Sequence, residues 1–133
     1  MTDENTHLGI EKLTVIYVDD TGALLSTVKR SVRGTSYKFY AYEDPIKALE
    51  EIEKMQDVAL VISDFKMPGM NGDKLLMRIA ELHPSTIRIL SSADTKNLMQ
   101  AQQQGVAHKY VEKGELVMNA RELIYNAVLE YLK

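Results

Sequence analysis

The chain has 133 residues, of which 45% are hydrophobic and 26% charged, and its formal net charge is −3. This length suits one domain with a single core, and the mildly acidic balance argues against nucleic-acid binding by the domain itself. The sequence contains no cysteine, which excludes disulfides, zinc–thiolate sites and thiol chemistry. No stretch resembles a membrane span or a secretory signal, so we expect a cytoplasmic protein without a membrane partner.

Strand-like and helix-like patterns alternate along the chain. Asp44 followed by Pro45 is a typical helix start, after which we expect Ile46, Leu49 and Ile52 to face inward. In chain order, the predicted elements are a strand over 13–18, a helix over 21–33, a strand over 36–42, a helix after Asp44, a strand over 58–63, a helix over 71–82, a strand over 86–90, a helix over 94–104, a strand over 108–113 and a helix over 115–132. We expect residues 1–11 to form a flexible lead and residues 12–133 to form one domain.

Five successive strand–helix units predict an α/β fold. Right-handed crossovers then require a parallel sheet with helices on both faces. The apolar runs over 13–18, 58–63 and 86–90 belong in the middle of this sheet, and the more mixed runs over 36–42 and 108–113 belong at its edges. The result is a doubly wound, flavodoxin-like sheet with strand order 2-1-3-4-5. Its crevice is expected beyond the carboxyl ends of the first and third strands, where the strand order reverses.

Carboxylates follow the two strands that border this crevice. Asp19 and Asp20 come directly after the first strand, and Asp64 comes directly after the third. Two like charges about 4 Å apart repel by about 4 kcal/mol at an effective dielectric near 20, so protons or a cation must offset the repulsion. Several carboxylates in an all-oxygen site suit Mg²⁺ or Mn²⁺. Helix capping is the plainer alternative for Asp19 and Asp20.

A hydroxyl and an ammonium group are expected at the same edge of the sheet. Ser91 follows the fourth strand, and Lys113 ends the fifth. Together with the three acids, they would form a site for a hard metal ion next to an ammonium group that can pair with an added anion. Phosphoryl transfer needs these parts, because positioning and charge neutralisation supply most of its catalysis. The alternatives are an ordinary strand-end serine and an ordinary surface lysine.

These motifs resemble those of bacterial two-component response-regulator receiver domains. The matching segments are VDD, SDFKMPGMNG, ILSSAD and YVEKG, and the resemblance covers residues 13–133. It implies a signalling domain, not a turnover enzyme, that accepts a phosphoryl group on Asp64 from a histidine kinase, a phosphotransfer protein or a small phosphodonor. The face made by the fourth helix, fifth strand and fifth helix would then signal to an effector or a fused output domain. Weak homodimerisation is compatible with this function.

The resemblance also implies which residues hold the metal. Asp20 and Asp64 would ligate Mg²⁺ or Mn²⁺ directly, together with the backbone carbonyl of Lys66, and Asp19 would act mainly through a water. The Lys66 side chain stands two residues after Asp64, at a position that varies in the family and tunes dephosphorylation. We therefore expect it to alter the lifetime of the phosphoryl group.

The remaining implied roles concern the phosphoryl group and its detection. Lys113 would pair with the phosphoryl oxygens, and Ser91 would hydrogen-bond to one of them. Tyr110 matches an aromatic switch position, although a plain edge-strand aromatic is the alternative. Gly114 departs from the pattern, because the family usually has proline after the lysine and glycine allows many backbone conformations.

Three other functions compete with this interpretation. The first is a degenerate receiver that docks a partner without phosphorylation, which Gly114 leaves open. The second is a haloacid-dehalogenase-like phosphatase, which would need an Asp-x-Asp motif where this chain has Asp19 and Asp20 side by side. The third is a flavodoxin, which is disfavoured because two carboxylates after the first strand would repel its phosphate.

Overall fold

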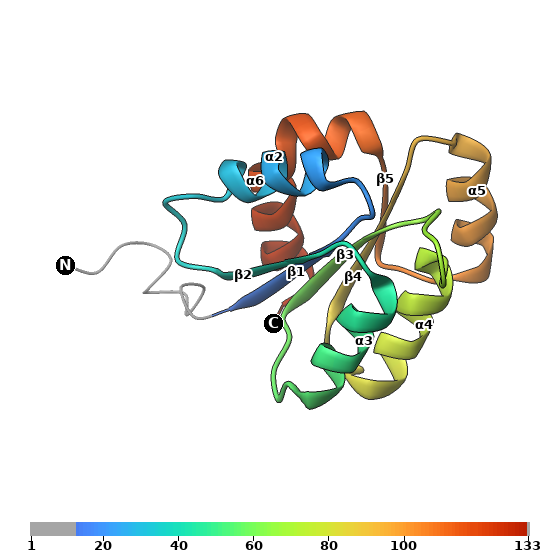
Figure 1. The fold of residues 1–133 in the computed structure, drawn as a ribbon, viewed down its shortest axis with the longest axis horizontal. Coiled ribbons are helices and arrows are strands. Elements are labelled where there is room, and N and C mark those ends of the chain that lie inside the picture. Colours follow the sequence, from blue (N-terminus) through green and yellow to red (C-terminus); the bar gives the residue numbers. More distant parts are fainter. Residues whose placement is uncertain (1–12, 133) are drawn as a thin grey trace.

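The computed structural model describes residues 13–132, so the predicted lead over residues 1–11 lies outside the described residues. Its elements in chain order are β1 Thr14–Val18, α2 Gly22–Ser31, β2 Lys38–Tyr42, α3 Pro45–Lys54, β3 Leu60–Asp64, α4 Gly72–Leu82, β4 Ile87–Ser92, α5 Thr95–Gln104, β5 Lys109–Glu112 and α6 Lys113–Tyr131. The five strands form one parallel sheet in the order β2-β1-β3-β4-β5, which confirms the predicted topology (Figure 1).

The sheet separates two hydrophobic layers. Successive residues of a strand point to opposite faces, so Val15 and Tyr17 of β1 pack with α2 and α6, and Ile16 and Val18 pack with α3, α4 and α5. Figure 1 shows the same division, with α2 and α6 on one face of the sheet and the other three helices on the opposite face. The central strand β3 is buried along its whole length, which explains its continuous apolar sequence.

Local signals define several helix ends, and the predicted helix start at Asp44 is confirmed. The Asp44 carboxylate accepts a hydrogen bond from the Ile46 backbone N–H at 2.9 Å. Asp94 caps α5 in the same way, by accepting from the Lys96 N–H at 2.9 Å. Gly105 ends α5 in the left-handed conformation, with φ of 68°, which costs glycine little because it has no Cβ.

One predicted core position is wrong. Ile46 is 41% exposed, and Ala48 takes the buried position in α3 together with Ile52. Ala48 and Ile52 are one helical turn apart and share a face, whereas Ile46 is turned away from both. The predicted burial of Leu49 is only partial.

The last helix also differs from its prediction. It begins at Lys113, two residues earlier than expected, and Asn119 inside it has non-helical angles (φ −131°, ψ 29°). A short helical segment therefore carries the lysine, and a longer one packs on the sheet through Ile124 and its neighbours. The early start was not predicted, because glycine is a weak helix former and Gly114 argued against a helix at this position. Tyr131, near the end of this helix, is 37% exposed.

The two ends of the described chain lie close together at the amino-terminal edge of the sheet (Figure 1). Leu13, Thr14 and Leu132 line one cavity of about 330 Å³, together with Asp57 and Ser85. The carboxyl ends of the strands lie at the opposite edge.

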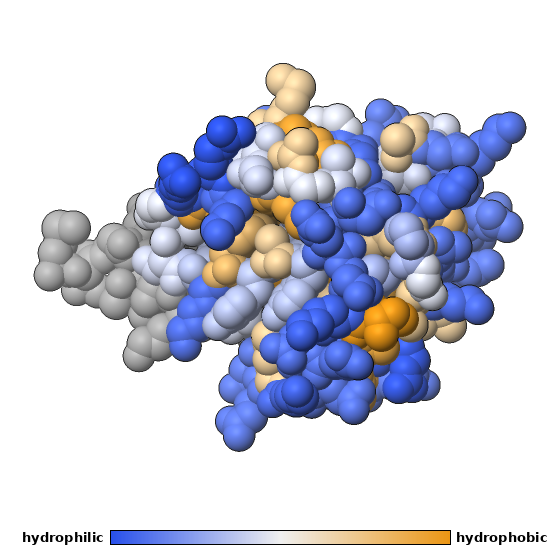
Figure 2. All heavy atoms as spheres, in the orientation of Figure 1, coloured by the Kyte–Doolittle hydropathy of each residue, from blue (hydrophilic) through white to orange (hydrophobic). Residues whose placement is uncertain are grey.

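The face of the molecule seen in Figure 2 is mainly polar. In Figure 2, blue atoms dominate the visible face, and orange atoms form small, separate patches. Among the described residues, no helix is both long enough and apolar enough to cross a membrane.

Candidate functional site

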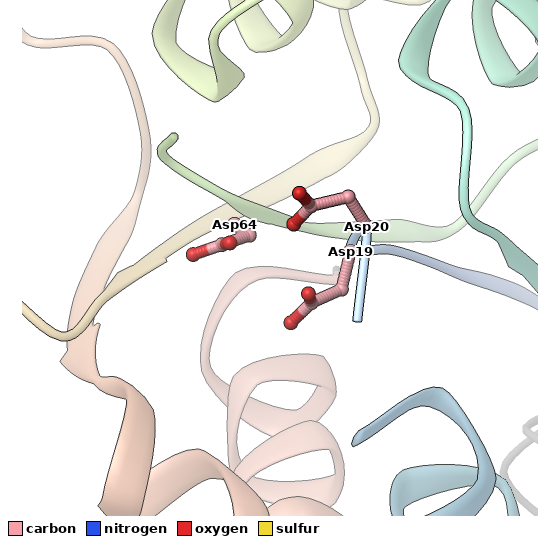
Figure 3. Close-up of side chains that lie close together, drawn as sticks. All are labelled: Asp19, Asp20 and Asp64. Atoms are coloured by element: carbon pink, nitrogen blue, oxygen red, sulfur yellow. The ribbon is translucent and has the colours of Figure 1, made fainter. Parts of the chain in front are cut away.

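Three carboxylates meet at the carboxyl edge of the sheet, as the sequence predicts. β1 and β3 are neighbours, with Val18 opposite Ser63, so the residues that follow in each strand come together. Asp19, Asp20 and Asp64 each have an oxygen within 4.8 Å of an oxygen of the other two. Figure 3 shows the three side chains gathered at the ends of these strands. Their close approach brings negative charges together in a partly dry environment.

Asp19 is the most enclosed of the three acids. It has no exposed surface, whereas Asp20 is exposed. One Asp19 oxygen accepts the Thr21 backbone N–H at 2.9 Å, and the other accepts the Tyr17 hydroxyl at 2.6 Å. Burial raises the pKa of Tyr17, and the hydrogen bond to Asp19 raises it further, so the phenol remains a donor. These contacts hold Asp19 in one orientation.

Sequence reasoning missed the role of Tyr17. Its only signal was a hydroxyl on an otherwise apolar strand, two residues before an acid. Residues i and i+2 of a strand lie on the same face, so this spacing brings the Tyr17 hydroxyl and the Asp19 carboxylate together.

Asp64 is joined to Lys113 by a direct ion pair. The Lys113 Nζ lies 2.8 Å from Asp64 Oδ2 and 3.2 Å from Asp19 Oδ2, so one ammonium bridges two acids. The other Asp64 oxygen accepts the Phe65 backbone N–H at 3.0 Å. Burial raises the pKa of the Asp64 carboxyl, although Lys113 acts in the opposite sense. Burial lowers the pKa of the Lys113 ammonium, but Asp64 and Asp19 outweigh it, and the net shift is upward.

The turn after β3 depends on Gly72. A Cβ at this position would lie 2.0 Å from the Asp64 carbonyl oxygen, which no side chain could occupy without moving the backbone. The Gly72 N–H donates to the Phe65 carbonyl at 2.6 Å, and the Ser63 hydroxyl donates to the Asp64 carbonyl at 2.9 Å. The final glycine of the SDFKMPGMNG segment therefore lets α4 begin directly against the strand that carries Asp64.

Two serines at the end of β4 differ in their surroundings. Ser91 pairs with Asp64 in the sheet register, is fully buried, and its Oγ has no hydrogen-bond partner among the described residues. Buried hydroxyls are usually hydrogen-bonded. The Ser91 hydroxyl next to Asp64 is therefore unusual, and since no described residue pairs with it, it is free to bond to a ligand. Ser92 Oγ instead accepts the Asp94 N–H at 3.0 Å.

A cavity of about 730 Å³ opens over the site. Asp20, Asp64 and Lys113 line it, as does Lys66, so four of the predicted site residues border one space. Ser92 also borders it, whereas Ser91 does not. Asn71 and Asn97 supply further polar groups that sequence reasoning missed. The cavity is large and polar enough to admit a phosphoryl group.

Tyr110 lies apart from the acids and is tied to α5. Its hydroxyl accepts the Ala107 N–H at 2.8 Å and donates to the Ala101 carbonyl at 3.4 Å. The ring is half-buried against the layer formed by α3, α4 and α5. Its switch role stays a prediction.

Comparisons with known proteins agree with this geometry. The sequence profile of the response regulator receiver domain matches residues 15–124. The DNA-binding transcriptional regulator NtrC of Escherichia coli is 32% identical over 117 residues, which is 86% of this chain but 24% of that protein. The chain thus spans about a quarter of the length of this relative.

Solved structures give the same result. An uncharacterized protein from Neptuniibacter caesariensis aligns with a TM-score of 0.80 and 27% identity, over 88% of this chain and 87% of that one. The signal receiver domain of an HD domain-containing protein from Pseudomonas fluorescens Pf-5 aligns with a TM-score of 0.71 and 27% identity, over 87% and 97% of the two chains. The chain therefore belongs to the family of response regulator receiver domains, the signalling modules of two-component systems.

Proposed function

We propose that Asp64 accepts a phosphoryl group in a reaction that depends on Mg²⁺ or Mn²⁺. The observation that carries the proposal is the Lys113 ammonium, which lies 2.8 Å from Asp64 Oδ2 at the wall of the cavity. A lysine that already pairs with the acceptor can pair with the phosphoryl oxygens once they are attached. A purely structural ion pair would not need an ammonium group, two buried acids and an open cavity in one place.

The transfer requires one bond to form and one to break. An Asp64 carboxylate oxygen attacks the phosphorus of a phosphohistidine, and the P–N bond breaks with its electron pair remaining on the imidazole. Lys113 then stabilises the negative charge of the product, which amounts to about 1.5 to 2 charges at neutral pH. The family resemblance implies a hydrogen bond from Ser91 to one phosphoryl oxygen, but its fully buried hydroxyl does not border the cavity. Ser92 does border it, and its O–H donates to no acceptor among the described residues, so we propose Ser92 as the better-placed donor to a phosphoryl oxygen.

The carboxylates present fit a hard divalent cation. Oxygens of Asp19, Asp20 and Asp64 lie within 4.8 Å of one another, and carboxylate oxygens are the ligands that Mg²⁺ and Mn²⁺ prefer. Asp20 and Asp64, with the Lys66 carbonyl, would hold the cation directly, and Asp19 would contact it through a water. A bound cation neutralises charge on the acids and on the transferring group.

The donor and the output are proposed from the family. A histidine kinase or a phosphotransfer protein would supply the phosphoryl group in the cytoplasm. The face made by α5, β5 and α6 would signal to an effector or an output domain, with Tyr110 reporting the change. The NtrC relative is described as a DNA-binding transcriptional regulator, but this chain covers too little of it to extend that activity here.

The test is incubation with Mg²⁺ and acetyl phosphate, followed by intact-mass measurement. We expect the wild type to gain one phosphoryl group and Asp64→Asn to gain none. Asp57→Asn is the matched control, because Asp57 borders the cavity at the opposite edge of the sheet. A wild type that gains no phosphoryl group and does not respond to beryllofluoride would contradict the proposal and favour phosphorylation-independent docking.

A further inference from the structure

A second groove, between α4 and the α5–β5 turn, uses none of the residues proposed for phosphorylation. It has a volume of about 560 Å³ and an apolar floor that includes Met70, Met77 and Val106. Met77 is 54% exposed there, so its side chain is accessible to a partner. Methionine side chains adapt to different apolar partners, so such a floor suits the docking of another apolar side chain.

The rim of this groove is positively charged in an otherwise acidic chain. Lys74, Arg78 and Arg88 border it, against one acid, Glu81. Glu81 pairs with Arg78 at 3.0 Å, and both side chains are largely exposed. Lys74 and Arg88 have no ion-pair partner among residues 13–132. The local excess of positive charge favours an acidic ligand.

Arg88 is the most informative of these cations. It is half-buried in β4, and its Nε donates to the Val106 carbonyl at 3.1 Å, which fixes the guanidinium at the groove. Burial lowers the pKa of Arg88, so holding this charge without an acid costs stability. Arginine presents its donors in a planar fork that matches a carboxylate, and the described residues supply no carboxylate to it.

We propose that this groove binds an acidic segment of a partner protein. One apolar side chain of the segment enters between Met70 and Met77, and a neighbouring carboxylate pairs with Arg88. Lys74 adds attraction at the rim, where it raises the association rate more than the affinity. The groove includes Gln104, the last residue of α5, so it borders the α5, β5 and α6 face proposed for output, but neither the three aspartates of the acid cluster nor Lys113 line it.

The test is an NMR titration of the ¹⁵N-labelled protein, without phosphodonor, using a short capped peptide of alternating glutamate and leucine. We expect chemical-shift changes centred on the groove, and a Kd that weakens about tenfold in Met77→Gln and in Arg88→Met. Met99→Gln on α5 is the matched control, because Met99 is 64% exposed and does not line the groove. The Kd of the Met99→Gln variant for the peptide should equal that of the wild type.

Other outcomes would overturn the proposal. If the same peptide with glutamine in place of glutamate binds with an equal Kd, Arg88 does not pair with a carboxylate of the ligand. Equal weakening by Met77→Gln and Met99→Gln would show that the peptide binds elsewhere. Sedimentation that detects a dimer disrupted by Met77→Gln would assign the groove to a second copy of the chain. Met77→Gln changes an exposed side chain, so the test does not depend on whether Arg88→Met folds.

Discussion

Replacing Gly72 by alanine adds a methyl group where the backbone leaves no room. Its Cβ would lie 2.0 Å from the Asp64 carbonyl oxygen and 2.8 Å from the Ser63 Oγ. Real Cβ atoms essentially never approach other atoms more closely than 3.0 Å. The start of α4 must therefore move by about 1 Å relative to the end of β3, and a packed interior resists such movement.

The change in the free energy of unfolding is the sum of two destabilising contributions and one stabilising contribution. Overpacking costs about 1–3 kcal/mol. The shift also weakens the hydrogen bond from the Gly72 N–H to the Phe65 carbonyl, which contributes about 1 kcal/mol. The higher helix propensity of alanine offsets about 1 kcal/mol. We expect the free energy of unfolding to fall by roughly 2 kcal/mol.

Urea denaturation measures this change directly. Gly114→Ala is the matched control, since Gly114 is also helical but a Cβ there would meet nothing within 4 Å. We expect that variant to match the wild type or to be more stable by about 0.5–1 kcal/mol. An unfolding midpoint for Gly72→Ala at or above the wild-type value would refute the reasoning, because the helix start would then adjust without cost.

Three further predictions concern single side chains. Tyr17→Phe removes a hydrogen bond to the buried Asp19 carboxylate and should lower the free energy of unfolding by about 1.5–3 kcal/mol in urea; an unchanged midpoint would contradict it. Ser91→Ala removes a buried hydroxyl without a partner and should raise stability by about 1 kcal/mol in the unphosphorylated protein, whereas a loss would mean that the hydroxyl has a partner. Burial, followed by the charge of Arg88, lowers the pKa of His108 below its ordinary 6.5, so the unfolded chain binds the proton more readily. Stability should then fall as the pH drops through 6.5 toward the lower folded pKa, and a pH titration of His108→Gln with an equally steep slope would disprove this.

The topology and the acid cluster were predictable because they depend on patterns along the chain. Continuous apolar runs identify buried parallel strands, and right-handed crossovers leave few ways to order them. Once the order is known, residues that follow neighbouring strands must meet at one edge. Asp19, Asp20 and Asp64 required no further information, and Lys113, the residue directly after β5, lies at the same edge.

Contacts between side chains were not predictable in the same way. The bond from Tyr17 to Asp19 depends on rotamers, and the different surroundings of Ser91 and Ser92 depend on how far β4 extends. The exposure of Ile46 depends on the rotation of a helix about its axis, which apolar spacing alone defines poorly when the helix is short. The groove around Arg88 required the positions of elements far apart in the sequence.

The shared cavity of Leu13 and Leu132 has a consequence for engineering. Because these two residues border one small space, a short linker could join them, and the chain could be opened elsewhere as a circular permutant. A reporter domain fused through either of these positions would emerge at the edge of the sheet opposite Asp64. A reporter at that edge would leave the approach of a phosphodonor to Asp64 unobstructed. A signal from the acid cluster would, however, have to cross the whole domain to reach it.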